Sequence, residues 1–240
     1  MHRSNVMPET RREAVRNSSP SLARLGLDAN IAIVEAAGNH HPVYLIAKRA
    51  MDFAGSLALL LFFSPLLIAV TLVLMITTKG RPFFVQNRIG YRGKHFPMIK
   101  FRTMRLDADQ VQHMVANEHA SGPIFKNKTD PRITKIGRWL RRTSIDEAPQ
   151  LLNVLLGHMS LVGPRPPVLK EVKQYEMWHR RRLAVKPGLT CLWQVSGRSE
   201  VGFEDWIRMD LWYVRHQSFW VDLKLLALTP YTVLTCRGAY

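Results

Sequence analysis

The chain has 240 residues, 47% of them hydrophobic, and its 34 Lys and Arg outnumber its 18 Asp and Glu to give a formal net charge of +16. This length fits one main domain with a sizeable core, and this charge favours polyanionic partners such as anionic lipid, nucleic acid or phosphorylated substrates. The two cysteines, Cys191 and Cys236, provide neither a disulfide framework nor metal-ligand spacing, and they fit a reducing, cytosol-facing compartment.

The sequence divides into three parts by composition. Residues 1–45 are polar, dotted with arginine and low in aromatics, which predicts a flexible extension with at most one short helix at 22–37. Residues 46–80 form a membrane segment, and residues 81–240 are expected to form one cytosolic domain.

The membrane segment is the longest apolar stretch of the chain. Residues 53–78 contain no charge, and about 20 apolar residues suffice to cross roughly 30 Å of hydrocarbon. Ser64 and Pro65 stand in the middle, and a proline there removes a backbone donor and kinks or breaks the helix. Each arm then has about a dozen residues, roughly 18 Å, which is too short to span alone.

Positive charge flanks the segment on both sides. Lys48 and Arg49 precede it, and Lys79 and Arg81 follow it. Because positive charge marks the cytoplasmic side of a membrane segment, we expect a re-entrant helix-break-helix that enters and returns on the same face. A single kinked spanning helix is the alternative, since proline is tolerated in membrane helices.

The rest of the chain reads as mainly helical with a small β element. Two short strands are predicted at 83–86 and His95–Phe101, joined by a glycine turn at 90–93. Residues 107–119 are mostly helix formers. Further helices follow, interrupted by Pro- and Gly-rich loops at 163–167 and 186–188.

Two further segments bear on the membrane. Residues 134–142 place Ile136, Trp139 and Leu140 on one face with basic residues around the other. This pattern fits a basic amphipathic helix at a lipid surface, and equally an ordinary helix packed on the core. Aromatic residues crowd between 206 and 220, and they fit either head-group depth or a packed core.

The densest cluster of reactive side chains lies at 141–150. Ser144 and Glu147 have capping-box spacing, whereas Pro149 favours a helix that starts near Ile145 or Asp146. Either start places Asp146 at a helix N-terminus, which keeps a carboxylate ionised and attracts phosphate. Asp146 is therefore a candidate covalent nucleophile toward phosphorus, and Glu147 a candidate ligand for Mg²⁺.

Several arginines are candidates to complete such a site. Arg165 lies between prolines on a stiffened loop, which suits bidentate contact with phosphate. Arg102 follows the second predicted strand, and Arg198 lies in a turn. Nucleophile-elbow, phosphate-loop, Rossmann and zinc patterns are absent from the sequence, so ordinary hydrolases, kinases and dehydrogenases lack support.

These residues form a series of motifs that resembles the bacterial monotopic phosphoglycosyl transferases, the sugar transferases that begin exopolysaccharide, O-antigen and glycoprotein glycan assembly. The resemblance runs from about residue 46 to the end. It is carried by the basic pair at 48–49, the Ser-Pro pair at 64–65, and the motifs QNRIG at 86–90, KFRTM at 100–104, DPRIT at 130–134, DEAPQLLNV at 146–154, SLVGPRP at 160–166, KPGLT at 186–190, WQVSGR at 193–198 and RGAY at 237–240.

The resemblance implies a reaction at the bacterial inner (cytoplasmic) membrane, with the catalytic domain facing the cytoplasm. Asp146 would attack the β-phosphorus of a UDP-sugar, release UMP and carry the sugar phosphate until undecaprenyl phosphate accepts it. Glu147 matches the Mg²⁺ ligand of the family, and Arg141 and Arg165 match its phosphate-contacting arginines. Gln194 and Arg198 fall in its last active-site motif.

Departures from the family pattern are local. His158 stands where Asp is usual, and Cys191 where Gly is usual, which affects the shape of two loops. The form of the motif at 193–198 resembles the branch that transfers hexose 1-phosphates such as glucose or galactose. The spans that precede the anchor in longer family members are not found in residues 1–45.

A non-enzymatic function is the alternative: a membrane-anchored basic module that binds anionic lipid or nucleic acid. It explains the charge and the anchor, but not the ordered loops or the acidic pair, and the sequence contains no nucleic-acid motif. We therefore expect a UDP-sugar, undecaprenyl phosphate and membrane lipid as partners, and no nucleic acid. A homodimer is compatible with the sequence but not indicated by it.

Overall fold

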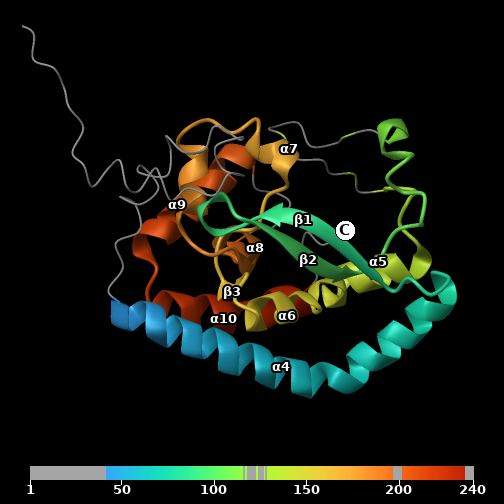
Figure 1. Ribbon diagram of the computed structural model, residues 1–240, viewed down its shortest axis with the longest axis horizontal. Coiled ribbons are helices and arrows are strands. Elements are labelled where there is room, and N and C mark those ends of the chain that lie inside the picture. The colour runs from blue at the N-terminus through green and yellow to red at the C-terminus, as the bar shows by residue number, and fades with distance from the viewer. Residues whose placement is uncertain are drawn as a thin grey trace, which may run out of the picture.

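The computed structural model describes residues 42–115, 117, 123, 127, 129–196 and 202–235. The expected extension up to residue 41, its short helix at 22–37, Arg198 and the motif at 237–240 lie outside these residues. The described chain is mostly helical, as predicted, and it has two small sheets where the sequence indicated one small β element (Figure 1).

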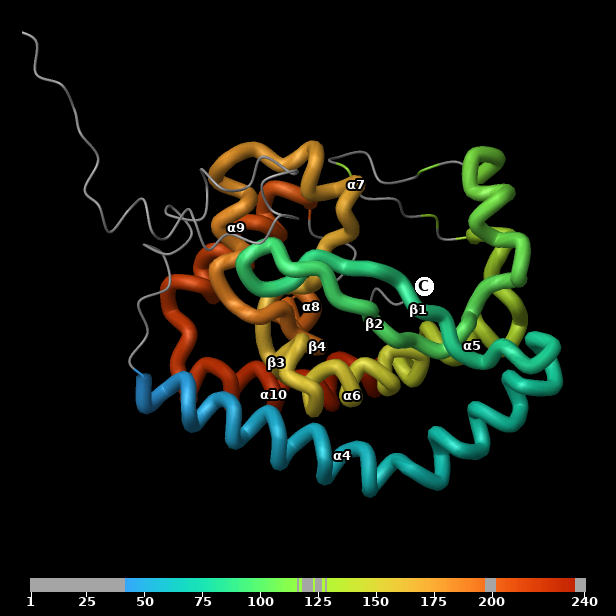
Figure 2. Tube along the Cα trace, viewed as in Figure 1, coloured from blue at the N-terminus to red at the C-terminus, as the bar shows by residue number. Residues whose placement is uncertain are grey.

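Helix α4, Pro42–Thr77, contains the predicted membrane segment and runs along one edge of the molecule (Figure 1). It is the one helix among the described residues that is long and apolar enough to cross a membrane. The helix continues through Pro65, and Figure 2 shows it bending near its middle. The expected break is thus a bend, as a proline inside a helix produces.

Both ends of α4 pack against the rest of the domain, and its middle does not. Lys48, Asp52 and Ser56 are buried in the first half, and Val70 and Leu74 in the second. No residue from 57 to 69 is buried. Apolar side chains such as Phe62 (76% exposed) project from this middle section.

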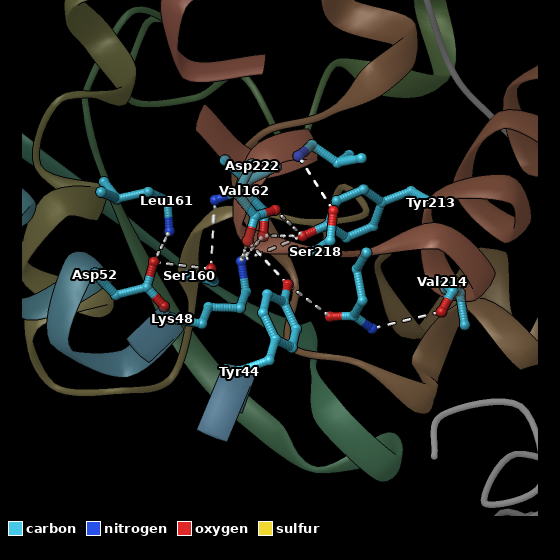
Figure 3. A network of polar contacts seen from close by, with 12 residues as sticks. Tyr44, Lys48, Asp52, Ser160, Leu161, Val162, Tyr213, Val214, Ser218 and Asp222 are labelled. Carbon is cyan, nitrogen blue, oxygen red and sulfur yellow. Dashed lines mark hydrogen bonds and ion pairs between the residues drawn. The ribbon is translucent and has the colours of Figure 1, made fainter. Parts of the chain in front are cut away.

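Residues 48 and 49, expected where the chain enters the membrane, bind protein groups. Lys48 donates to Asp222 of helix α10, Phe219–Leu234, at 2.8 Å, and to Tyr213 of helix α9, Phe203–His216 (Figure 3). Arg49 donates to the carbonyls of Val154 and Leu155 at the end of helix α6, Gln150–Leu155, where the helix dipole favours a cation. These contacts hold the first half of α4 on α6 and α10.

The predicted strands form an antiparallel hairpin. Strand β1, Phe83–Ile89, pairs with β2, His95–Phe101, across the short 3₁₀ turn Tyr91–Gly93. Arg92 and Gly93 adopt positive φ in this turn. Strand β1 extends to Ile89, beyond the predicted 83–86, whereas β2 has the predicted bounds. Side chains at alternate positions of each strand face the same side.

A second, parallel sheet joins β3, Ser160–Val162, to β4, Gly188–Thr190. Sequence analysis predicted no strand at either segment, because three-residue strands carry no periodicity. The two backbones meet closely at glycines: a Cβ on Gly188 would lie 2.0 Å from the Gly163 nitrogen. Helices α4, α6 and α10 contact this sheet, and residues of β3 belong to the largest cluster of buried apolar side chains in the described chain.

The remaining described elements are short. They are the 3₁₀ turns Gln112–Met114, Ile145–Glu147 (η3) and His179–Ala184 (η4), and the helices α5, Lys135–Arg142, α7, Leu169–Val172, and α8, Leu192–Ser196. The helix suggested at 107–119 was wrong over its described part, where one 3₁₀ turn replaces it. Helix formers alone do not make a helix without an apolar face to bury.

Helix α5 packs on the second half of α4. Leu140 is fully buried with Val70, Leu74 and Phe101, whereas Trp139 is 51% exposed. Of these two neighbouring residues, Leu140 therefore belongs to the core and Trp139 is exposed at the surface. The later aromatic group divides in the same way, with Trp206 buried and Trp212, Phe219 and Trp220 exposed.

Candidate active site

A cleft of about 460 Å³ lies between the β1–β2 hairpin and the segments that follow α5. The predicted site residues in the described chain all line it: Arg102, Arg141, Asp146, Glu147, Arg165 and Gln194. They come from five separate segments, so the fold brings together what the sequence disperses. Arg198 lies outside the described residues.

Asp146 sits in the 3₁₀ turn η3, directly before α6. Ser144 precedes the turn in the left-handed region, with φ 58°, and its side chain makes no capping hydrogen bond. The capping-box interpretation of Ser144 and Glu147 was therefore wrong. The helix expected to start near Ile145 or Asp146 is a 3₁₀ turn at Ile145–Glu147, and α6 begins only at Gln150 with Pro149 as its N-cap, so Asp146 does not lie at the N-terminus of an α-helix. Asp146 is only 8% exposed and lines the cleft.

Glu147 lies next to Asp146 and is held by two cations. The Nζ of Lys100 donates to its Oε1 at 2.6 Å, and Nη1 of Arg165 lies 4.0 Å from the same oxygen. Lys100 comes from the end of β2 and Arg165 from the proline-rich loop. The pair of carboxylates therefore sits between the hairpin and that loop.

The surroundings shift the pKa values of the two carboxyl groups in opposite directions. Burial, reinforced by the neighbouring Glu147, raises the pKa of Asp146 to about 6. Burial acts in the same direction on Glu147, but Lys100 and Arg165 outweigh it and lower the pKa of Glu147 to about 2. Near neutral pH both groups are ionised, and Asp146 is the more basic of the two.

Arg141 reaches the cleft from the last turn of α5. Its Nε donates to Thr103 Oγ1 at 2.9 Å, and burial lowers the pKa of its guanidinium. Helix α5 approaches this strand end through Gly137, where a Cβ would lie 1.9 Å from the Thr103 carbonyl oxygen. A glycine in mid-helix thus sets the position of Arg141.

Arg102 and Gln194 also line this cleft. The Arg102 guanidinium donates to the carbonyls of Arg81 and Phe83, just beyond α4. Gln194 Oε1 accepts from the thiol of Cys191 at 3.0 Å. Cys191 is buried and its φ is not positive, so the substituted residue supports the cleft side chain instead of serving as a glycine-like turn.

Sequence analysis missed two cations of the site, Lys100 and Arg88. Both line the cleft, and Arg88 is 8% exposed with Nη1 donating to the Pro166 carbonyl. A signal was present: Phe84 pairs with Lys100 in the hairpin, and residues 84, 86 and 88 share one face by strand alternation. Applied to the hairpin, that rule places both cations on the cleft side.

The second departure, His158, stands apart from this site. Its ring lies 5.9 Å from that of Phe96, at the end of β2 opposite Lys100. The imidazole is exposed and does not line the cleft.

The site suits one divalent cation if substrate phosphates complete its ligands. Within the described residues, no group of three or more His, Cys, Asp or Glu could hold a metal ion. Mg²⁺ does not require one, because one or two carboxylates together with phosphate oxygens often bind it. Glu147, next to Asp146, is the candidate for such a ligand.

Comparison with known proteins places this chain in a family. Residues 43–236 match the family described as bacterial sugar transferase. The chain is 45% identical over 199 residues to galactosyl transferase CpsE of Streptococcus agalactiae, covering 82% of this chain and 44% of that protein. It is 43% identical to undecaprenyl-phosphate galactose phosphotransferase of Salmonella typhimurium, covering 80% and 41%.

A shorter relative matches nearly end to end. The exopolysaccharide production protein ExoY of Rhizobium meliloti is 38% identical over 213 residues, covering 87% of this chain and 94% of ExoY. The match to the larger relatives spans less than half of their length. This chain belongs to the bacterial sugar transferase family.

Proposed function

We propose that this protein transfers a sugar 1-phosphate from a UDP-sugar to undecaprenyl phosphate and so begins an exopolysaccharide-type glycan. The observation that carries the proposal is the buried Asp146 beside the half-buried Glu147 in a cleft lined by Arg88, Lys100, Arg141 and Arg165. The names of the relatives in Salmonella and Rhizobium support the lipid acceptor and the pathway.

The reaction has two displacements at one phosphorus. An oxygen of Asp146 bonds to the β-phosphorus as the bond to the oxygen bridging the two phosphates breaks, and that electron pair leaves with UMP. A phosphate oxygen of the lipid then bonds to the same phosphorus, and the bond to Asp146 breaks to restore the carboxylate. Neither step requires a net proton transfer, which suits a site that has several cations and, among the described residues that line it, no histidine.

Cationic side chains supply most of the catalysis expected here. Phosphoryl transfer depends on positioning and on neutralising charge. Arg141 precedes the two carboxylates in the sequence and Arg165 follows them, and both arginines line the same cleft. Glu147 would hold Mg²⁺ together with the nucleotide phosphates. When bound, the ion would neutralise the negative charge of the diphosphate.

We further propose that α4 is re-entrant. A helix of 36 residues is about 54 Å long, yet both of its ends pack on the same domain while its middle is exposed and apolar. The exposed Trp220 and Trp139 add aromatic side chains suited to head-group depth. The domain would then face the cytoplasm at the inner membrane, within reach of both the nucleotide and the lipid phosphate.

The proposed sugar donor is a UDP-hexose, with UDP-glucose and UDP-galactose as the first candidates. The test is UMP release from a panel of UDP-sugars with purified protein, Mg²⁺ and undecaprenyl phosphate. Release with one donor, abolished by Asp146→Asn, is the expected result. A folded, membrane-bound protein that releases no UMP with any UDP-sugar would contradict the proposal and favour the alternative of a lipid-binding module.

A further inference from the structure

The loop that carries Arg165 is held at every carbonyl from residue 164 to 167. Three of these four residues are prolines, which lack an N–H and leave the carbonyls as the only backbone groups able to bond. The donors come from four different residues, each at 2.9 Å: Gly188 N to Pro164, Arg182 Nη2 to Arg165, Arg88 Nη1 to Pro166 and Ile89 N to Pro167.

Of these four donors, Arg182 supports the Arg165 loop from outside the cleft. It belongs to η4, is 2% exposed and does not line the cleft. Its Nη2 bonds the carbonyl of Arg165, and its Nη1 donates to the hydroxyl of Tyr175 at 2.7 Å. Asp210 of α9 forms an ion pair with it, and each of the two side chains is 1% exposed.

A buried ion pair is a weak device for stability alone. Removing two charges from water costs several kcal/mol per ion, and well-packed apolar residues often serve equally well. The Arg182–Asp210 pair sits in an apolar and aromatic cluster that includes Trp206 and Tyr175. An apolar replacement would lack the directed bonds to the Tyr175 hydroxyl and to the Arg165 carbonyl, and the second of these reaches the loop of the site.

We propose that Arg182, oriented by Asp210, is a positioning residue that fixes the Arg165 loop for catalysis, an inference that rests on the proposed function. The residue whose carbonyl Arg182 holds is the residue whose guanidinium lies 4.0 Å from Glu147. Loss of the bond lets the loop shift, and Arg165 then meets the transferred phosphate in the wrong place.

The first test is Arg182→Lys. Lysine keeps the charge beside Asp210, but a compact ammonium cannot reproduce the planar fork that bonds Asp210, Tyr175 and the loop together. We expect kcat to fall about 100-fold, the scale of a misplacement near 1 Å, while the melting temperature changes little. Arg181→Lys is the matched control, one residue earlier and with no hydrogen bond to the loop among the described residues.

A double-mutant cycle with Arg165→Lys separates positioning from stability. If Arg182 acts through Arg165, the double variant loses about as much kcat as the worse single variant, because the second change removes an effect already lost. Additive losses, or a loss in Arg182→Lys matched by unfolding, would overturn the inference.

A second variant keeps the test decisive if Arg182→Lys folds poorly. Tyr175→Phe removes only the hydroxyl that accepts from Arg182, so we expect a smaller loss of kcat that is again non-additive with Arg165→Lys. Full activity in Tyr175→Phe together with an additive cycle would contradict the positioning role. A wild-type protein without UMP release would contradict the proposed function instead, and active wild type with unaffected variants would contradict this inference alone.

Discussion

At the scale of single residues, Asp146 and Glu147 are neighbours whose environments give them different roles. Glu147 contacts Lys100 directly, whereas Asp146 is buried beside a negative neighbour, and the pKa values separate accordingly. Separation of this kind between adjacent carboxyl groups is a sign of assigned chemical roles. The more basic carboxylate is the better nucleophile, which supports Asp146 for the attack on phosphorus.

The raised pKa of Asp146 predicts how the rate depends on pH. Below about 6 the carboxyl group is protonated and cannot attack, and above that value it is ionised. We therefore expect kcat/KM for the UDP-sugar to rise with pH around a midpoint near 6, since this parameter reports groups of the free enzyme. A profile that is flat from about pH 5 upward would contradict this assignment, because an ordinary Asp titrates near 4.

Removal of Lys100 should affect both carboxyl groups. Lys100 lowers the pKa of each, so Lys100→Met is expected to move the acid limb of the profile to higher pH and to reduce kcat at neutral pH at least tenfold. Lys94→Met is the control on the same hairpin, where the side chain is exposed. An unchanged acid limb in Lys100→Met would show that the ion pair with Glu147 does not tune the site.

At the scale of secondary-structure elements, the pattern of the sequence predicted those with clear signals. The hairpin followed from two apolar strands and a glycine turn, and α5 from the apolar residues on one face of 134–142, whereas its N-cap, Thr134, is seen only in the structure. The β3–β4 sheet did not follow, because its three-residue strands depend on contacts between Gly163 and Gly188 far apart in the chain. Lys48 and Arg49 were interpreted as charges at the membrane entry, because the sequence alone cannot show that Lys48 pairs with Asp222 and that Arg49 donates to carbonyls at the end of α6.

The site shows the same division. Asp146, Glu147 and the proline-framed Arg165 could be predicted because each stands in a local motif. Lys100 and Arg88 depend on strand alternation and on which face of the hairpin meets η3, and the support from Arg182 depends on tertiary packing alone.

The close approach of α5 predicts that Gly137→Ala is destabilising. The added Cβ would overlap the Thr103 carbonyl, so we expect the free energy of unfolding to fall by about 1–3 kcal/mol, with a further loss of activity as Arg141 moves away from Thr103. Denaturant unfolding in detergent measures the first effect and UMP release the second. Arg138→Ala, at an exposed position of the same helix, should stay within about 0.5 kcal/mol of wild type.

At the scale of the whole molecule, two helices that contact each other, α4 and α10, expose large apolar side chains. Helix α4 contributes Leu61, Phe62 and Ile68, and α10 contributes Trp220 and Leu234. Figures 1 and 2 show these two helices side by side along the same edge of the molecule, and their contacts confirm it. Exposed apolar side chains on two neighbouring helices of a basic protein fit the proposed attachment to an anionic lipid surface.

The re-entrant arrangement predicts that both ends of α4 are reached from one side of the membrane. Single cysteines at Val43 and Arg81, both exposed, should react with an impermeant maleimide only from the cytoplasmic face, as should the control Lys173→Cys on the soluble domain. Labelling of the first two positions from opposite faces would establish a spanning helix and contradict the re-entrant proposal.

The central claim is that Asp146 becomes covalently bound to the sugar phosphate. The most direct measurement is mass spectrometry of the protein after incubation with the UDP-sugar and Mg²⁺ but without lipid acceptor. The account predicts release of UMP up to one equivalent and a sugar-phosphate adduct on the peptide that contains Asp146, both absent from Asp146→Asn. UMP release that requires the lipid and leaves no adduct would mean direct transfer between substrates and would contradict the account.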